Sequence, residues 1–252
     1  MRILLIRHAE PDYPHDSLTE KGFREAALLR PRLAAYDLAA CYVSPLGRAR
    51  ATAACALEGT SHQPETLDWL QEFRARIQDP VTGQPRLVWD LPPRFWTAEP
   101  LLLDPVRWVD APMFDGENVR SVWDETCAGV DSLMAHYGFR KDGPVWRCDR
   151  NAHITIALFC HFAISMVIAG YLLEISPMVL LHRCFCAPSA VTELVTEERI
   201  PGEAAFRMTK LGDLTHLEAN GEPRSLAGLF PEVYTGVDST DQTRNGCQPL
   251  LP

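Results

Sequence analysis

The chain has 252 residues, 46% of them apolar, and its 24 basic and 33 acidic residues give a formal charge of −9. A globular chain of this length buries enough surface to fold as one large domain or two small ones without a disulfide framework. The negative charge argues against a general nucleic-acid or anionic-membrane partner, because that affinity comes mainly from Lys and Arg. Any anionic ligand must therefore be held at a local site.

The cysteines and the apolar runs predict a reduced, cytoplasmic protein. The eight cysteines include no C-x-x-C pair and lie mostly in apolar stretches, which is typical of buried thiols rather than of disulfides or a zinc site. The apolar run at residues 3–6 is too short for a secretory signal. Residues 157–173 fall short of the roughly 20-residue membrane span and include His161, so a buried strand followed by a helix explains them better.

Short apolar runs alternate with helical patterns in the first part of the chain. Residues 2–6 predict a buried strand, and a helix follows as far as Leu33 with Thr19 as its N-cap. Residues 39–43 predict the next strand, and residues 46–57 the next helix. This alternation predicts an α/β fold, a three-layer α/β/α sandwich with a mainly parallel central sheet.

The second part of the chain begins with an irregular stretch. Residues 79–112 are rich in proline and tryptophan, which indicates an insertion of irregular structure. The elements predicted after it are a helix at 115–137, a strand at 153–159, a helix at 162–173, and an antiparallel pair at 190–195 and 204–208. We expect a single domain over residues 1–252, with 74–150 as an inserted lid or cap and 228–252 as a loose C-terminal tail.

Charged side chains come directly after three of the predicted strands. Arg7 and His8 end the first strand, Arg48 follows the second, and His161 follows the strand at 153–159. Because the carboxyl ends of parallel strands open onto one crevice, these side chains should meet there. A lone histidine is usually structural, but two histidines and two arginines at one rim indicate an anion-binding site.

The sequence also resembles the histidine phosphatase superfamily, which includes the phosphoglycerate mutases. The segments that carry the resemblance are Arg7-His8-Ala9-Glu10, Leu18-Thr19-Glu20-Lys21-Gly22, residues 44–53 (Ser-Pro-Leu-Gly-Arg-Ala-Arg-Ala-Thr-Ala), Gly116-Glu117-Asn118, and His161. The resemblance implies that His8 is a catalytic nucleophile that becomes phosphorylated. It also implies that Arg7, Arg48 and His161 are catalytic and substrate-binding residues that hold the phosphoryl oxygens.

These roles fit the chemistry of phosphoryl transfer. His8 must be neutral to attack phosphorus, and nearby positive charges favour its neutral form. The Arg7 and Arg48 guanidinium groups donate paired hydrogen bonds to phosphate without losing their charge. His161, if protonated, would add a third positive donor. Positioning and charge stabilisation then supply most of the catalysis, so we expect no metal and no other cofactor.

The leaving alkoxide needs a proton donor. In the small phosphatases of this family the donor lies after the third strand, in a segment that residues 70–72 match, and this implies Glu72. A bound phosphate dianion would raise the pKa of Glu72 and keep it protonated. Glu65 and Glu99 are the alternative donors, and an exposed structural carboxylate is the alternative role for Glu72.

The chain departs from the family pattern at several positions. Pro14 stands where an asparagine that helps to bind phosphate is common, and Phe162 replaces a small residue after His161. Phe162 therefore either shapes access of the substrate or packs in the core. Glu10 and residues 116–118 either support the site or cap loops.

The insertion contains most of the aromatic side chains that could contact a substrate. Five of the six tryptophans lie between Glu72 and residue 153, interleaved with arginines. We expect Trp96 and Arg94 to bind the organic or second anionic part of a phosphate ester from a lid. The alternative is that these aromatic residues form the insertion's own core.

Together these features predict a metal-independent phosphatase that hydrolyses a small-molecule phosphate monoester through a phosphohistidine. The alternatives are a phosphomutase of the same fold and a catalytically silent protein that binds a phosphorylated ligand. We expect no nucleic-acid and no membrane partner, and a homodimer is left open.

Overall fold

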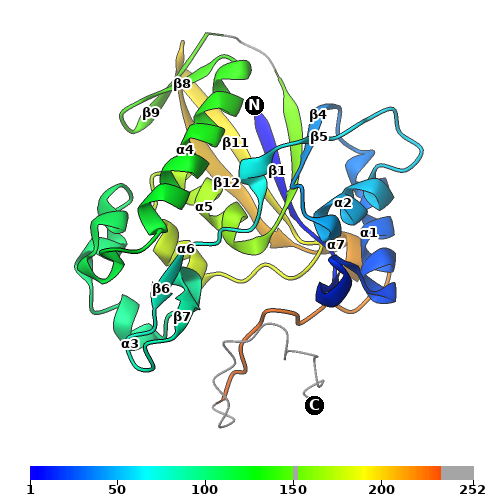
Figure 1. Cartoon of the computed structure of the whole chain (residues 1–252). Helices are drawn as coiled ribbons and strands as arrows, with labels where there is room; N and C mark the ends of the chain where they lie inside the picture. Colours follow the sequence, from blue (N-terminus) through cyan, green and yellow to red (C-terminus); the bar gives the residue numbers. More distant parts are fainter. Residues whose placement is uncertain (150–152, 234–252) are drawn as a thin grey trace.

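The computed structural model describes residues 1–149 and 153–233 (Figure 1). The strands of its main sheet are β1 (Arg2–Arg7), β4 (Leu38–Val43), β5 (Glu65–Thr66), β8 (Phe139–Asp142), β9 (Val145–Cys148), β10 (Thr155–Cys160), β11 (Val191–Ile200) and β12 (Glu203–Asp213). Within the described residues this sheet has eight strands in the order β5-β4-β10-β1-β11-β12-β9-β8. The strands from β5 to β1 pair in parallel, and the others extend the sheet in antiparallel fashion from β1. The parallel half carries the strand ends at which the site was predicted.

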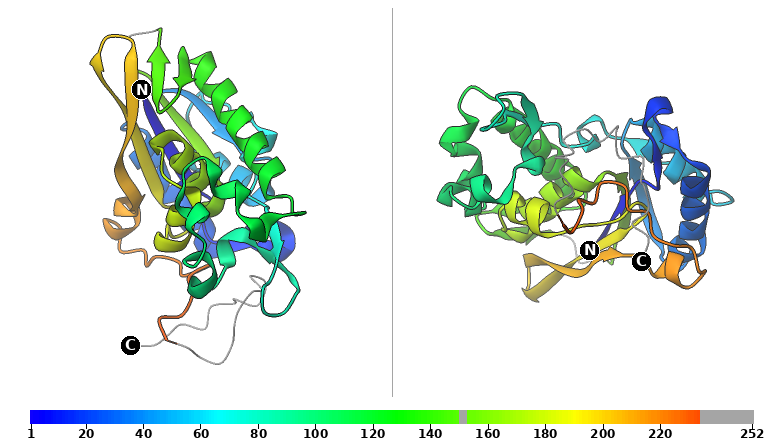
Figure 2. Two further views of the ribbon diagram at one scale, coloured as in Figure 1. Left: turned by 90° about the vertical axis from the view of Figure 1, so that its left-hand side faces the viewer. Right: turned by 90° about the horizontal axis from the view of Figure 1, so that it is seen from below.

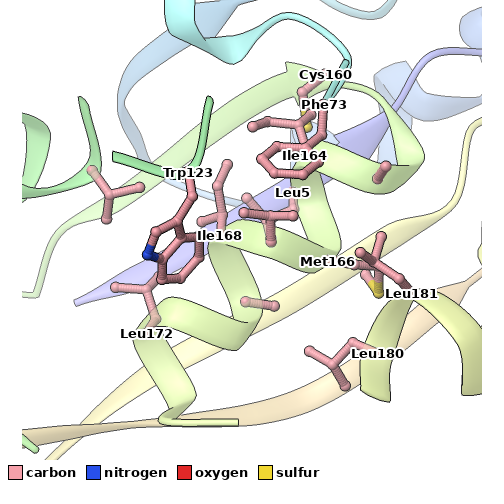
Figure 3. Close-up of a cluster of buried hydrophobic side chains, with 14 of the residues drawn as sticks. Leu5, Phe73, Trp123, Cys160, Ile164, Met166, Ile168, Leu172, Leu180 and Leu181 are labelled. Atoms are coloured by element: carbon pink, nitrogen blue, oxygen red, sulfur yellow. The ribbon is translucent and has the colours of Figure 1, made fainter. Parts of the chain in front are cut away.

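Helices cover both faces of the sheet, which confirms the three-layer α/β fold. On one face lie α1 (Glu20–Leu33), α2 (Gly47–Ala56) and α7 (Thr215–Glu218), and on the other lie α4 (Val119–His136), α5 (Phe162–Leu173) and α6 (Pro177–Arg183) (Figures 1 and 2). The continuous apolar run of β1 serves both faces: Ile3 and Leu5 pack with α5, whereas Leu4 and Ile6 pack with α1 and α2. Figure 3 shows Leu5 close to residues of α5, with Trp123 of α4 nearby.

The apolar run at 157–173 divides into β10 and the buried helix α5, as predicted. No helix in the described part of the chain is both long and apolar enough to cross a membrane.

The residues around Thr19 correctly predicted where α1 begins. The Thr19 side chain accepts a hydrogen bond from the Gly22 backbone N–H at 3.0 Å, so Thr19 is the N-cap as predicted. Gly22 is needed there because a Cβ would lie 2.2 Å from the Glu10 carbonyl oxygen. This close approach holds α1 against the segment that follows the first strand.

The antiparallel hairpin β11–β12 is longer than the strands predicted from the apolar pattern at residues 190–195 and 204–208. β11 and β12 continue pairing to Ile200 and Glu203, although Ile200 is 60% exposed. Backbone hydrogen bonds extend the hairpin past the core, where side-chain burial no longer marks the strands.

The predicted insertion at 74–150 consists of two different parts. The antiparallel strands β6 (Arg76–Gln78) and β7 (Pro85–Leu87), the short helix α3 (Pro93–Trp96) and several 3₁₀ turns lie outside the main sheet. The buried side chains of this part belong to the same apolar cluster as those of α4, whereas the β8–β9 hairpin joins the main sheet through β12. The irregular part therefore ends before α4 begins at Val119, and a lid over residues 74–150 stays a prediction. Of the predicted tail, residues 228–233 have no helix or strand, and residues 234–252 lie outside the described part of the chain.

Candidate active site

The two histidines meet because their strands are neighbours. Arg7 is the last residue of β1 and pairs in register with Cys160 at the end of β10. His8 and His161 follow these two residues, and their ring centroids lie 5.1 Å apart. His161 is also the N-cap residue of α5, and Arg48 lies in the first turn of α2, directly after β4. Strand ends thus bring the predicted residues to one place.

The His8 ring is held in a form that can act as a nucleophile. Its Nδ1 lies 2.8 Å from the Ala9 carbonyl oxygen, and because a carbonyl only accepts, Nδ1 carries the hydrogen. The lone pair is therefore on Nε2. Burial, together with the charges of Arg7 and Arg48, lowers the pKa of His8 well below its usual value. The imidazole is thus neutral at pH 7.

The arginine side chains are fixed by groups remote in sequence. Arg7 donates from Nη1 to the Cys186 carbonyl oxygen at 2.6 Å and from Nη2 to the Ala227 carbonyl oxygen at 3.1 Å. Arg48 donates from Nη1 to the Asp16 carboxylate at 2.7 Å. These anchors leave little rotational freedom in either guanidinium, so both are preorganised for an anion.

Asp16 is a site residue that the sequence analysis missed. Its carboxylate accepts from the Gly47 backbone N–H at 2.6 Å as well as from Arg48. Its backbone has φ of 44°, an unusual conformation for a residue other than glycine. Asp16 thereby ties the turn after β1 to the start of α2. Its place two residues before Leu18, next to the segment 18–22 that carries the resemblance, was the available signal.

Ser44 orients the His161 ring. The Ser44 hydroxyl is fully buried and lies 2.8 Å from His161 Nε2, while the Leu46 N–H donates to the same oxygen at 3.3 Å. When the hydroxyl donates to Nε2, the ring hydrogen lies on Nδ1, the nitrogen without a protein partner. Burial and the charges of His8, Arg48 and Arg7 lower the pKa of His161 well below its usual value. The structure therefore favours a neutral donor instead of the third positive charge considered from the sequence.

Three buried nitrogens of these residues have no hydrogen-bond partner in the described part of the chain. They are Arg7 Nε, Arg48 Nε and His161 Nδ1. A buried donor without an acceptor costs about 1–3 kcal/mol, so such donors are rare in a folded protein. Their occurrence on neighbouring residues around His8 indicates a ligand with several acceptor atoms, and a phosphoryl group has this chemistry.

The Glu72 carboxyl group is close enough to Arg7 and Arg48 for both positive charges to affect its pKa. Its Oε1 accepts from the Phe73 N–H at 3.0 Å and from the Ile164 N–H, in the first turn of α5, at 3.1 Å. Burial raises the pKa of Glu72 although Arg48, Arg7 and these two N–H groups act in the opposite direction. A carboxyl group with a raised pKa is suited to donate a proton.

The alternative donors and supporting residues have other roles. Glu65 is exposed on the short strand β5, and Glu99 caps a 3₁₀ turn by accepting from the Leu101 N–H. Glu117 and Asn118 accept backbone N–H groups of β6, which matches the loop-capping alternative.

Glu10 supports the segment around His8. Its carboxylate accepts from the Thr19 hydroxyl at 2.9 Å, and its backbone N–H donates to Glu25 at 2.9 Å. Burial raises the pKa of Glu25 to about 7.

Trp96 and Arg94, both predicted to bind substrate, lie in different surroundings. Trp96 is buried and lines a pocket of about 560 Å³ together with Phe162. Arg94 is exposed, lies 4.6 Å from the Phe95 ring and does not line this pocket. The arginines on the pocket wall are instead Arg86 and Arg183, and the Arg183 guanidinium lies 4.7 Å from the centroid of the Trp96 ring.

Within residues 1–149 and 153–233, no group of three or more His, Cys, Asp or Glu side chains is arranged to hold a metal ion. The cysteines in this part of the chain are free thiols.

Comparisons with known proteins agree with this architecture. The family model described as histidine phosphatase superfamily (branch 1) matches residues 3–201. Among solved structures, a mutant phosphoserine phosphatase from Entamoeba histolytica in complex with phosphoserine has a TM-score of 0.57 at 18% identity, covering 86% of this chain and 98% of that chain. A mycobacterial glucosyl-3-phosphoglycerate phosphatase has a TM-score of 0.56 at 19% identity, covering 84% and 98%. Among curated proteins no match was found.

The family match covers most of the chain, including the strand ends that precede His8 and His161. At these low identities the solved structures show that the fold is shared. The chain therefore belongs to the histidine phosphatase superfamily.

Proposed function

We propose that the protein is a phosphatase that hydrolyses a small-molecule phosphate monoester through a phosphohistidine on His8. The observation that carries this proposal is the neutral His8 ring, with its Nδ1 hydrogen fixed by the Ala9 carbonyl oxygen and cationic donors beside it. Two of the solved structures with this fold are named as phosphatases of phosphoserine and of glucosyl-3-phosphoglycerate. These names support a phosphatase activity.

The chemistry follows from the positions of the side chains. His8 Nε2 attacks phosphorus, the bond between phosphorus and the ester oxygen breaks, and Glu72 gives its proton to that oxygen. Water then attacks the phosphohistidine, its proton passes to the Glu72 carboxylate, and the phosphorus–nitrogen bond breaks to release inorganic phosphate. Arg7, Arg48 and the Nδ1–H of His161 stabilise the negative charge on the transferring oxygens.

The side chains supply the positive charge that a metal would otherwise provide. Arg7 and Arg48 lie beside His8 and keep their charge at any physiological pH. We therefore expect catalysis without a metal ion. The free cysteine thiols suit a reducing compartment such as the cytoplasm.

Release of inorganic phosphate tests the proposal against its two alternatives. Wild-type protein is incubated with phosphoserine, 3-phosphoglycerate and phenyl phosphate, with and without a chelator. We expect phosphate release that the chelator does not change. Exchange of phosphate between positional isomers without net release would instead identify a mutase. Binding of inorganic phosphate without turnover of any ester would identify a silent phospholigand-binding protein.

Removal of the Ser44 hydroxyl should slow turnover without weakening substrate binding to the same degree. In Ser44→Ala the His161 hydrogen is no longer fixed on Nδ1, so we expect kcat to fall about tenfold with a smaller change in KM. Nitrogen chemical shifts of the His161 ring report which ring nitrogen carries the hydrogen.

Ser176→Ala is the matched control, because Ser176 is equally buried and donates to the Leu102 carbonyl oxygen, outside the site. If Ser44→Ala and Ser176→Ala have the same kcat, Ser44 has no role in orienting His161.

A further inference from the structure

The pocket that Trp96 lines adjoins the wall of the candidate active site. Phe162 and Phe185 line it, and their ring centroids lie 5.8 and 5.9 Å from the Arg7 guanidinium. Gly228 also lines it, and a Cβ at this glycine would lie 3.2 Å from Arg7 Nη2. Residues that contact the Arg7 guanidinium therefore also form one side of the pocket.

The pocket is built mainly from flat apolar side chains. Trp96 of α3 stacks on His182 of α6, with ring centroids 4.9 Å apart and an angle of 28° between the planes. Phe230 lines the pocket from the C-terminal segment and is 47% exposed, which is unusual for a phenylalanine. Aromatic walls of this kind favour a planar apolar ligand group, which can stack on one ring and contact the edge of another.

The positively charged side chains that line the pocket differ in whether a carboxylate of the protein already neutralises them. Arg86 lies between Asp79 and Asp90, both within salt-bridge distance, and is thereby neutralised. Arg183 stacks on the Trp96 ring and has no salt-bridge partner among the described residues. Burial lowers the pKa of His182 to about 4, so this ring adds no charge at pH 7. Arg183 is thus the lining cation that remains free to pair with an anion.

We propose that this pocket, lined by Trp96, Phe162, Phe185 and Phe230 with Arg183, is the binding site for the organic part of the substrate. The substrate class is a phosphate monoester of an aromatic alcohol that bears a carboxylate. The phosphoryl group lies at His8, the ring lies between the aromatic walls, and the carboxylate pairs with Arg183. The inference rests on the proposed phosphatase function, since it assigns the alcohol of that ester.

The test compares phenyl phosphate, 4-carboxyphenyl phosphate and phosphoserine as substrates of Phe230→Ala and Arg183→Gln. Both side chains are exposed, so neither change should unfold the protein. We expect Phe230→Ala to lower kcat/KM about three- to tenfold for both aryl esters and less than about twofold for phosphoserine. Arg183→Gln should lower kcat/KM about three- to tenfold for 4-carboxyphenyl phosphate and leave that for phenyl phosphate, which has no carboxylate, unchanged.

Matched controls separate the pocket from general surface effects. Phe23 of α1 is 43% exposed, close to the value for Phe230, and Arg199 on β11 is exposed on the opposite part of the sheet from the site. Phe23→Ala and Arg199→Gln should leave all three kcat/KM values unchanged. If Phe230→Ala or Arg183→Gln changes the three esters equally, or changes none of them, the pocket assignment is wrong while the phosphatase function stands.

Binding without turnover distinguishes failure of the pocket from failure of the proposed function. In a His8→Ala background, tryptophan fluorescence reports the Kd for 4-carboxyphenyl phosphate with and without Arg183→Gln. Should the wild-type protein hydrolyse no ester, a Kd about three- to tenfold weaker with Arg183→Gln still supports the pocket and refutes only the phosphatase function. An unchanged Kd in that case refutes both.

Discussion

Replacement of His8 by alanine should abolish hydrolysis, with kcat/KM lower by about 10⁴-fold or more. The loss is expected because no other described side chain combines a free Nε2 lone pair with the neighbouring charges of Arg7 and Arg48. The fold should persist, since the His8 backbone N–H and carbonyl oxygen keep their bonds to Cys160 and Ser189. Phosphate release is the measurement, and circular dichroism checks the fold.

A second measurement tests the covalent intermediate directly. Wild-type protein quenched in alkali with labelled substrate should retain label on a histidine, because a phosphoramidate survives alkali and hydrolyses in acid. His8→Ala should retain none. His136→Ala is the control, since His136 is exposed at the end of α4 and should trap label like the wild type. Equal rates of hydrolysis by wild type and His8→Ala would refute the mechanism in which His8 is the nucleophile.

Replacement of Glu72 by glutamine should lower kcat by about 10²–10⁴-fold for an alkyl ester such as phosphoserine. An alkoxide leaves poorly without a proton, whereas nitrophenolate is stable and leaves unprotonated. The first-turnover burst of nitrophenolate from 4-nitrophenyl phosphate should therefore be much less affected than the turnover of phosphoserine. A similar loss in both measurements would mean that Glu72 does not act as the acid.

The pH profile gives an independent check on Glu72. Because its folded-state pKa is raised, the carboxyl stays protonated to a higher pH than an ordinary glutamate and loses the proton as the pH rises further. The wild-type kcat for phosphoserine should thus decline on the alkaline side, and Glu72→Gln should lack this decline. Glu65→Gln and Glu99→Gln should keep the wild-type profile, and loss of the alkaline decline in either variant would reassign the donor.

Short-range patterns in the sequence determined the core of the fold. The apolar run of β1 is buried on both faces of the sheet, so its pattern alone predicted a central strand. The Thr19 N-cap and the break between β10 and α5 are equally local, since each depends on residues within one or two turns. Strand ends that carry Arg7, His8 and His161 then implied a shared rim, because parallel neighbours place their next residues side by side.

Long-range contacts decided what the sequence left open. The β8–β9 hairpin joins the main sheet through a short pairing with β12, which no local pattern near residue 139 records. Asp16 and Ser44 fix Arg48 and His161 through hydrogen bonds across 32 and 117 residues of chain. Arg183 reaches the pocket because α6 packs beside α3. Its stacking on Trp96 therefore depends on how these two helices meet in the folded chain. Periodicity and capping encode only the interactions of near neighbours, whereas the orientation of each side chain in the site depends on groups that meet after the chain has folded.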